Sequence, residues 1–277
     1  MYSGTTLRHG SGNIIGTHQK IDRVARRHLT RHLPKDVHFP TIREILHFEG
    51  KNGPDGIKRK SPAKDEPWHY IDPTDSTDTG LIVLIEEHLA NLTSALADDN
   101  HERASFEAAW LAHAIVDGLT PAHHFPLEEK LAELREGKGL ETRTTVKEKL
   151  VLPGKTPRQR VRNNWEFWGA KGVMTTHLLF EIGVATTIAP LRLESGSPNA
   201  NERIRVENGG FLPLFREAAL QIYGLKMYER FHKHGWSRDL ARLTRQELAP
   251  LIIKTVTLAW YDAAIRATRR RERRLAR

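Results

Sequence analysis

Apolar residues recur at three- and four-residue steps along most of this chain, which is the period of an α-helix. Residues 81–96, LIVLIEEHLANLTSAL, give the strongest pattern, and residues 102–117 repeat it after a turn at 97–100. Strand-like alternation is weak. Further helices are expected at 18–32, 41–48, 127–137, 172–190, 212–234 and from 245 to the C-terminus. The pattern predicts an all-α fold with a single compact multi-helix domain.

Two segments interrupt the helical pattern. Residues 50–79 are rich in Gly, Pro, Asp and Lys and are expected to form a long irregular connection. Residues 127–170 are strongly charged. We therefore expect a helical domain over 1–265, with a charged insertion at about 127–170, followed by a basic C-terminal tail at 266–277.

The composition narrows the chemistry. The chain has 277 residues, 15 His and no Cys, which excludes disulfides, a Cys nucleophile and thiolate zinc sites. A transition metal would be held by His, Asp and Glu. No run of 18 apolar residues occurs, and the first residues lack the apolar core of a secretory signal. We expect no transmembrane segment and a cytoplasmic location, while a secreted form whose leader has been removed stays open.

The formal net charge of +9 is unevenly distributed. Residues 269–277, RRRERRLAR, hold six Arg and one Glu and supply five of these charges. Such a tail could make a peripheral contact with an anionic membrane or a nucleic acid through 266–277. The alternative is a solvated helix end without a partner. The sequence does not indicate an oligomeric state.

The clearest chemical signal lies in residues 110–126, WLAHAIVDGLTPAHHFP. His113 and Asp117 are four residues apart on a predicted helix, so both side chains project from one face. Pro121 ends that helix, and His123 follows where the chain bends. Two imidazoles and a carboxylate could converge there on a cation such as Zn²⁺. Such a pair is more often structural, but its apolar neighbours make an unpartnered Asp costly and favour a metal or a polar network.

Four other short motifs carry similar residues. His177 and Glu181 are again four residues apart on a predicted helix, with apolar residues between them. His69 lies in the sequence WHYIDP, Asp55 lies in NGPD, and His18 stands near the head of the first helix. Each motif alone is compatible with a structural pair or a surface residue.

In this order the motifs resemble those of the zinc-dependent phospholipase C family and of the related P1/S1-type nucleases. The family signature, two His and an Asp around a Pro, is matched by His113, Asp117, Pro121 and His123. The resemblance implies that family's all-helical fold and a zinc cluster. By this resemblance one zinc is held by Asp55, His69 and His113, a second by His123, His177 and Glu181, and a third by His18 and Asp117, with Asp117 also bridging to the first.

The resemblance further implies a zinc-dependent phosphodiester hydrolase, most similar to phospholipase C. In such an enzyme a zinc-bound hydroxide attacks phosphorus, and Asp55 could assist as a base. The substrate would be a phospholipid or a nucleic acid, and the alternative enzyme is a P1/S1-like single-strand nuclease. A non-catalytic alternative is a helical module with a residual zinc site that binds anionic partners through its Arg-rich tail.

The chain departs from the family pattern at its third zinc site. Family members complete that site with the amine and carbonyl of an N-terminal Trp, whereas this chain starts with Met1. Two zinc ions are therefore expected, and the third lacks its family ligand. His9 is the only substitute that the sequence suggests, and the simpler interpretation of His9 is a terminal residue without a role.

The sequence leaves the substrate-binding residues unknown. Gly56 and Glu66 stand where the family's choline pocket has aromatic residues, so choline recognition does not carry over. Trp165, Phe167 and Trp168 lie among Lys and Arg at the end of the insertion, which could form a lid or a substrate wall. These aromatic residues could stack on bases, lie at a membrane interface or pack in a core.

Overall fold

The structure, a computed structural model, describes residue 1 and residues 16–60, 69–139 and 142–276, and every regular element in these ranges is helical. The expectation of a compact all-α protein is confirmed for this part of the chain. The elements are α1 (Thr17–Leu29), α2 (Ile42–His47), η1 (Gly50–Asn52), α3 (Pro54–Lys60), α4 (Gly80–Ala97), α5 (His101–Gly118), η3 (Pro121–His124), α6 (Leu127–Leu134), α7 (Val146–Leu150), α8 (Pro157–Trp168), α9 (Val173–Ile188), η5 (Glu194–Gly196), α10 (Ala200–Gly209), α11 (Leu212–Gly224), α12 (Met227–His234), α13 (Arg238–Leu243), η6 (Thr244–Leu248) and α14 (Ala249–Leu275).

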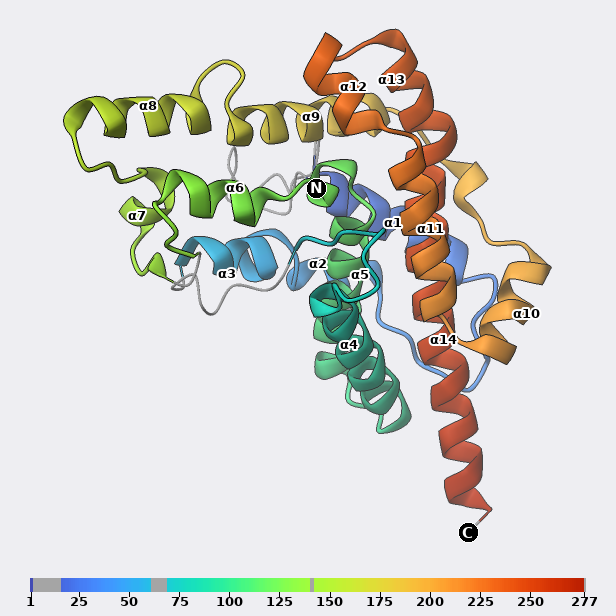
Figure 1. The fold of residues 1–277 in the computed structure, drawn as a ribbon. Coiled ribbons are helices and arrows are strands. Elements are labelled where there is room, and N and C mark those ends of the chain that lie inside the picture. The colour runs from blue at the N-terminus through green and yellow to red at the C-terminus, as the bar shows by residue number, and fades with distance from the viewer. Residues whose placement is uncertain (2–15, 61–68, 140–141, 277) are drawn as a thin grey trace.

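The main core lies between α1, α4, α5 and α14 (Figure 1). A turn of three residues joins α4 to α5, so the two helices run antiparallel and pack along their length. Trp260 of α14 is fully buried and donates its indole N–H to the carbonyl of Ala108 on α5, at 3.0 Å. Such a bond lets a large aromatic ring enter the core without leaving its N–H unpaired.

Two apolar stretches of this core are long enough, by length and composition alone, to cross a membrane. They are Gly80–Ala97 and Arg238–Leu275, and 56% and 83% of their apolar windows are buried inside the fold. Packing therefore accounts for their apolar character. The absence of a transmembrane segment and the cytoplasmic location stay predictions.

Residues 50–52 and 54–60 are helical, and the expectation of an irregular segment there is wrong. Gly50 takes a φ of 62°, which lets the chain turn after α2 into η1. A Cβ atom on Gly56 would lie 2.0 Å from the carbonyl oxygen of Lys51, so α3 packs on η1 only with Gly at this position. The close packing of α3 on η1 fixes the position of Asp55 in the first turn of α3.

The helix expected at 212–234 is divided into α11 and α12. Lys226, between them, has a φ of 52°, in the left-handed region that ends a run of α-helical hydrogen bonds. The structure also contains α8 and α10, which the apolar pattern did not indicate.

Residues 127–139 and 142–171 form an arm, which contains α6, α7 and α8 and projects from the main core (Figure 1). The arm has a small core of its own, made by Leu127, Leu131, Leu134, Leu152 and Phe167. Asn163 links α8 to the end of α6 and to the turn before α8, because its side-chain amide donates to the carbonyls of Leu134 and Pro153 at 2.9 and 2.8 Å. The expected insertion is thus a folded unit.

The basic C-terminal residues are the last turns of α14. Arg271 donates to the carbonyls of Leu96 and Ala97, where α4 ends, and Arg274 pairs with Asp98 at 2.6 Å. Arginine at the C-terminal end of a helix satisfies carbonyls that have no partner within that helix. Part of the positive charge of 266–277 is therefore engaged inside the protein.

We expect Gly118→Ala to destabilise the protein by about 1–3 kcal/mol, because a core that is already full cannot accept a methyl group. A Cβ atom there would lie 2.7 Å from the side chains of both Leu81 and Phe215, which are fully buried. Urea unfolding measures the effect. Gly209→Ala is the matched control, since no atom lies within 4 Å of the added methyl group. Equal effects of the two substitutions would contradict the prediction.

Candidate metal centre

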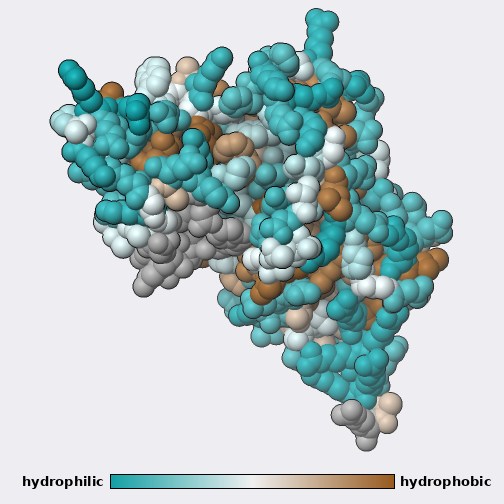
Figure 2. Space-filling view, in the orientation of Figure 1, coloured by the Kyte–Doolittle hydropathy of each residue, from teal (hydrophilic) through white to brown (hydrophobic). Residues whose placement is uncertain are grey.

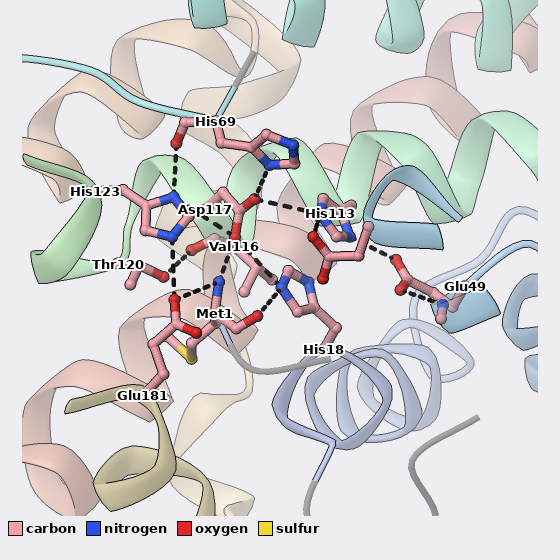
Figure 3. A network of polar contacts seen from close by, with 12 residues as sticks. Met1, His18, Glu49, His69, His113, Val116, Asp117, Thr120, His123 and Glu181 are labelled. Atoms are coloured by element: carbon pink, nitrogen blue, oxygen red, sulfur yellow. Dashed lines mark hydrogen bonds and ion pairs between the residues drawn. The ribbon is translucent and has the colours of Figure 1, made fainter. Parts of the chain in front are cut away.

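The eight side chains singled out from the sequence converge on one place, to which α1, α3, α5, η3 and α9 all contribute. Figure 3 shows His18, His69, His113, His123 and Glu181 around Asp117. They form three groups, and within each group the ligand atoms lie within 4.8 Å of one another. Seven of the eight side chains are buried, and Asp55 is half-buried. The groups are Asp55, His69 and His113; His123, His177 and Glu181; and His18, His113 and Asp117.

The end of α5 is shaped so that its two polar residues and η3 face one another. Nε2 of His113 lies 3.2 Å from Oδ2 of Asp117, one helical turn further on. The hydroxyl of Thr120 donates to the carbonyl of Val116 at 2.7 Å and closes the helix end. The chain then turns back through η3, and Nδ1 of His123 comes within 3.8 Å of Oδ1 of Asp117.

Asp117 is the central carboxylate of the site. Its Oδ1 accepts a hydrogen bond from the α-amine of Met1 at 2.5 Å and lies 3.3 Å from Nε2 of His18. Its Oδ2 accepts a hydrogen bond from Nδ1 of His69. Segments far apart in the sequence therefore meet at one side chain that is 1% exposed.

Asp117 stays ionised despite its burial. Burial alone would raise its pKa, but the positive Met1 amine and the protonated imidazole of His113 outweigh this effect and hold the pKa well below its usual range. An ionised carboxylate at the centre of a buried cluster attracts cations.

Glu181 organises the second group in the same way. Its Oε1 lies 2.9 Å from Nε2 of His177 and 3.1 Å from Nε2 of His123. The other ring nitrogen of His123 donates to the carbonyl of His69 at 2.7 Å, which turns Nε2 toward Glu181. Burial lowers the pKa of His123 to about 3, so this imidazole is neutral at pH 7, as a metal-binding His must be.

Asp55 gives the cluster its contact with solvent, since its side chain is 25% exposed. Its Oδ1 lies 3.9 Å from Nε2 of His113. Burial would raise the pKa of Asp55, but His113 and further imidazoles outweigh it and lower the pKa to about 2. Asp55 is therefore a carboxylate at neutral pH, and it is the most exposed of the eight side chains.

The main chain of Met1 enters the centre, which the sequence did not predict. Its α-amine lies 3.4 Å from Oε1 of Glu181, in addition to its bond to Asp117, and its carbonyl accepts from Nε2 of His18 at 2.8 Å. Burial would lower the pKa of this amine, but Asp117 and Glu181 outweigh it and raise the pKa to about 10. These contacts use main-chain atoms, so a search for a particular residue type does not find them. His9 and Glu66 lie outside the described residues.

Glu49 is a second residue that the sequence did not single out. It is buried, and its Oε1 accepts a hydrogen bond from Nδ1 of His113 at 3.2 Å. Burial would lower the pKa of His113, but Asp117 and Glu49 raise it well above the usual value. Glu49 thereby fixes the orientation of the imidazole and leaves Nε2 facing the cluster. A cation bound at Nε2 would replace the proton there.

The donor atoms of the three groups suit a divalent transition metal. They are imidazole nitrogens and carboxylate oxygens, the ligands that zinc takes in proteins that offer no thiolate. In a tetrahedral site with bonds of about 2 Å, ligand atoms lie about 3.3 Å apart, which is within the spacing of each group. Nε2 of His113 is buried and faces the carboxylates of Asp117 and Asp55, at 3.2 and 3.9 Å, so it points into the cluster.

We expect Glu49→Gln to weaken zinc binding by about 10-fold or more, because Glu49 orients a ligand and raises its basicity. Competition with a fluorescent chelator measures the affinity. The matched control is Glu107→Gln: Glu107 is also buried and accepts from Nδ1 of a histidine, His88, at 2.6 Å, but it belongs to none of the three groups. An equal loss of affinity in both variants would assign the effect to general destabilisation.

Comparison with known proteins adds no family to this description. No protein-family model matches the chain, and none of the curated proteins compared with it matches either. The function is therefore argued from the geometry of the centre and from the motifs in the sequence.

Proposed function

We propose that this protein is a zinc-dependent phosphodiester hydrolase with a metal centre of the phospholipase C type. The observation that carries the proposal is the convergence of five imidazoles and three carboxylates, from segments spread over residues 18–181, into three groups. An ion pair that only stabilises the fold needs two side chains, whereas eight ionisable side chains gather here. Burying eight such groups together is costly unless bound cations compensate the carboxylates.

Each group has a role in the proposal. Asp55, His69 and His113 would hold one zinc ion, and Asp117 would bridge it to a neighbouring ion. The second group would be held by His123, His177 and Glu181. Zinc bound there would act as a Lewis acid, lowering the pKa of water and offsetting negative charge on the phosphate.

Two side chains at the metal centre have further roles in the proposal: Asp55 as a base, and Tyr70 as a cover over His123. Asp55 is ionised at neutral pH and reaches solvent, so its carboxylate can accept a proton from a water molecule at the edge of the cluster. The ring of Tyr70 stacks on His123, with 5.0 Å between the ring centroids, and covers that ligand. The half-exposed position of Asp55 supports a centre that a substrate can reach, rather than a closed structural metal site.

The position of Met1 supports a third zinc ion, which goes beyond the two expected from the sequence. His18 and Asp117 would bind it together with the amine and the carbonyl of Met1. An amine can bind a metal only after losing its proton, and a metal ion at this position would replace the ammonium charge that now lies beside Asp117.

We expect Asp117→Asn to lower the hydrolysis of bis-p-nitrophenyl phosphate by on the order of 100-fold or more, and also to lower the zinc content, because the bridging charge is lost. Turnover and elemental analysis on the same sample measure both effects. Asp262→Asn is the matched control, since Asp262 is also buried but pairs with Arg266 at 2.7 Å. Wild-type protein that retains zinc without any turnover would favour the non-catalytic module.

A change at the N-terminus tests the third zinc ion. We expect the chain that begins at Met1 to bind about three zinc ions, and the same chain preceded by Gly-Ser to bind about two, because the amine becomes an amide. Native mass spectrometry counts the ions. The control carries the same Gly-Ser addition at the C-terminus, which lengthens the chain equally and leaves the amine and the carbonyl of Met1 unchanged. If the extended chain binds as many ions as the original, Met1 is not a ligand.

A further inference from the structure

The outer face of α8 is apolar although it faces solvent. Val161, Trp165 and Trp168 are spaced four and three residues apart and share one face of the helix. Val161 and Trp165 are each 70% exposed, and Trp168 is 39% exposed. Asn163 and Phe167, on the opposite face, are buried in the arm. Only Phe167 of the three aromatic residues singled out in the insertion therefore serves the core.

The end of α7 and the turn that follows it extend this face. Leu150 and Val151 are 51% and 44% exposed, and the indole N–H of Trp168 donates to the carbonyl of Leu150 at 2.7 Å. The side-chain amide of Asn164 also donates to the carbonyl of Leu152 at 2.8 Å, and its oxygen accepts a hydrogen bond from the N–H of Leu152 at 3.0 Å. The turn is thus fixed beside α8, and we call the five exposed side chains the outer patch: Leu150, Val151, Val161, Trp165 and Trp168.

The outer patch is concentrated rather than scattered. Among the described residues, eleven large apolar side chains are exposed, and five of them lie in this one segment of 19 residues, 150–168. Most of the remaining surface in this view is hydrophilic (Figure 2). Single exposed apolar residues are ordinary, whereas a contiguous group of them marks an interaction site.

Positive charge surrounds the outer patch. Residues 147–171 contain seven Lys or Arg and two Glu, an excess of five charges out of the +9 of the whole chain. Arg158 and Arg162 follow one edge of the apolar face of α8, and both are exposed. Glu166 is one of the two acidic residues, and it already pairs with Arg162 at 3.4 Å.

We propose that the outer patch docks on an anionic phospholipid bilayer. Tryptophan, aliphatic side chains and flanking Lys or Arg on one exposed helix face are the features of a helix that lies in a membrane interface. Nucleic acid would use the Trp rings and the positive charge but would leave Leu150, Val151 and Val161 against a polar backbone. A second copy of this chain would bring two positively charged faces together.

A short hydrogen-bonded path joins the outer patch to the metal centre. The hydroxyl of Thr175 in α9 donates to the carbonyl of Trp168 at 2.9 Å, and His177 follows Thr175 by two residues. The path from the outer patch to a ligand of the second group is therefore short and hydrogen-bonded. The docking surface itself does not depend on the metal centre, because no residue of the outer patch belongs to the three groups.

Vesicle sedimentation tests the proposal. Wild-type protein should bind vesicles of phosphatidylcholine and phosphatidylglycerol in equal parts, and bind less to vesicles of phosphatidylcholine alone or in high salt. The double variant Val161→Ser, Trp165→Ser should lose about tenfold or more of the affinity for the mixed vesicles. Both side chains project into solvent, so circular dichroism should show an unchanged fold.

A matched control and a turnover measurement complete the test. Ile204 and Leu220 are 53% and 49% exposed on other helices, and the double variant Ile204→Ser, Leu220→Ser should bind vesicles as the wild type does. Bis-p-nitrophenyl phosphate is soluble, so its turnover should be the same in both double variants and reports on the hydrolase separately from docking.

Three results would overturn the proposal. The first is vesicle binding that is unaffected by Val161→Ser, Trp165→Ser, or absent from the wild type. The second is the same double variant losing affinity for a single-stranded oligonucleotide while vesicles do not bind. The third is a wild-type dimer in analytical ultracentrifugation that this variant dissociates, again without vesicle binding.

Discussion

The burial of the Asp117 carboxylate is the constraint on which the rest of the structure depends. A carboxylate that is 1% exposed requires positive or hydrogen-bonding partners on every side, and α5 alone provides only His113. The other partners come from Met1, from His18 on α1 and from His69 after α3. The packing of α1 and η3 against α5 can therefore be understood as the arrangement that brings these partners within reach.

The local part of this arrangement could be predicted from the sequence. The apolar periods of α4 and α5 and the four-residue spacing of His113 and Asp117 are properties of single helices. The motifs also indicated His177 and Glu181, because they repeat that spacing. In each case the information lies within one turn of helix or one short turn of chain, where side-chain direction follows from spacing alone.

The remainder depends on three-dimensional proximity that spacing does not encode. Glu49 is one acidic residue among many until α2 and η1 bring it to His113. Met1 contributes main-chain atoms, which every residue has. The end of α11 before Lys226, the burial of Phe167 and the exposure of Trp165 likewise depend on which helix faces pack against other elements. These features follow from tertiary packing, which overrides local preference.

The contacts of the centre join residues that are far apart in the chain: Met1 and Asp117 are separated by 116 residues, and His123 and Glu181 by 58. Contacts of this separation close long loops, and they form only once the helices between them have packed. Each of the three groups takes its ligands from segments far apart in the sequence, so no short fragment of the chain contains a complete group. Metal affinity is therefore a property of the cooperative fold as a whole. An ion bound between His18 and Asp117 would join α1 to α5, so neither helix could unfold without releasing it.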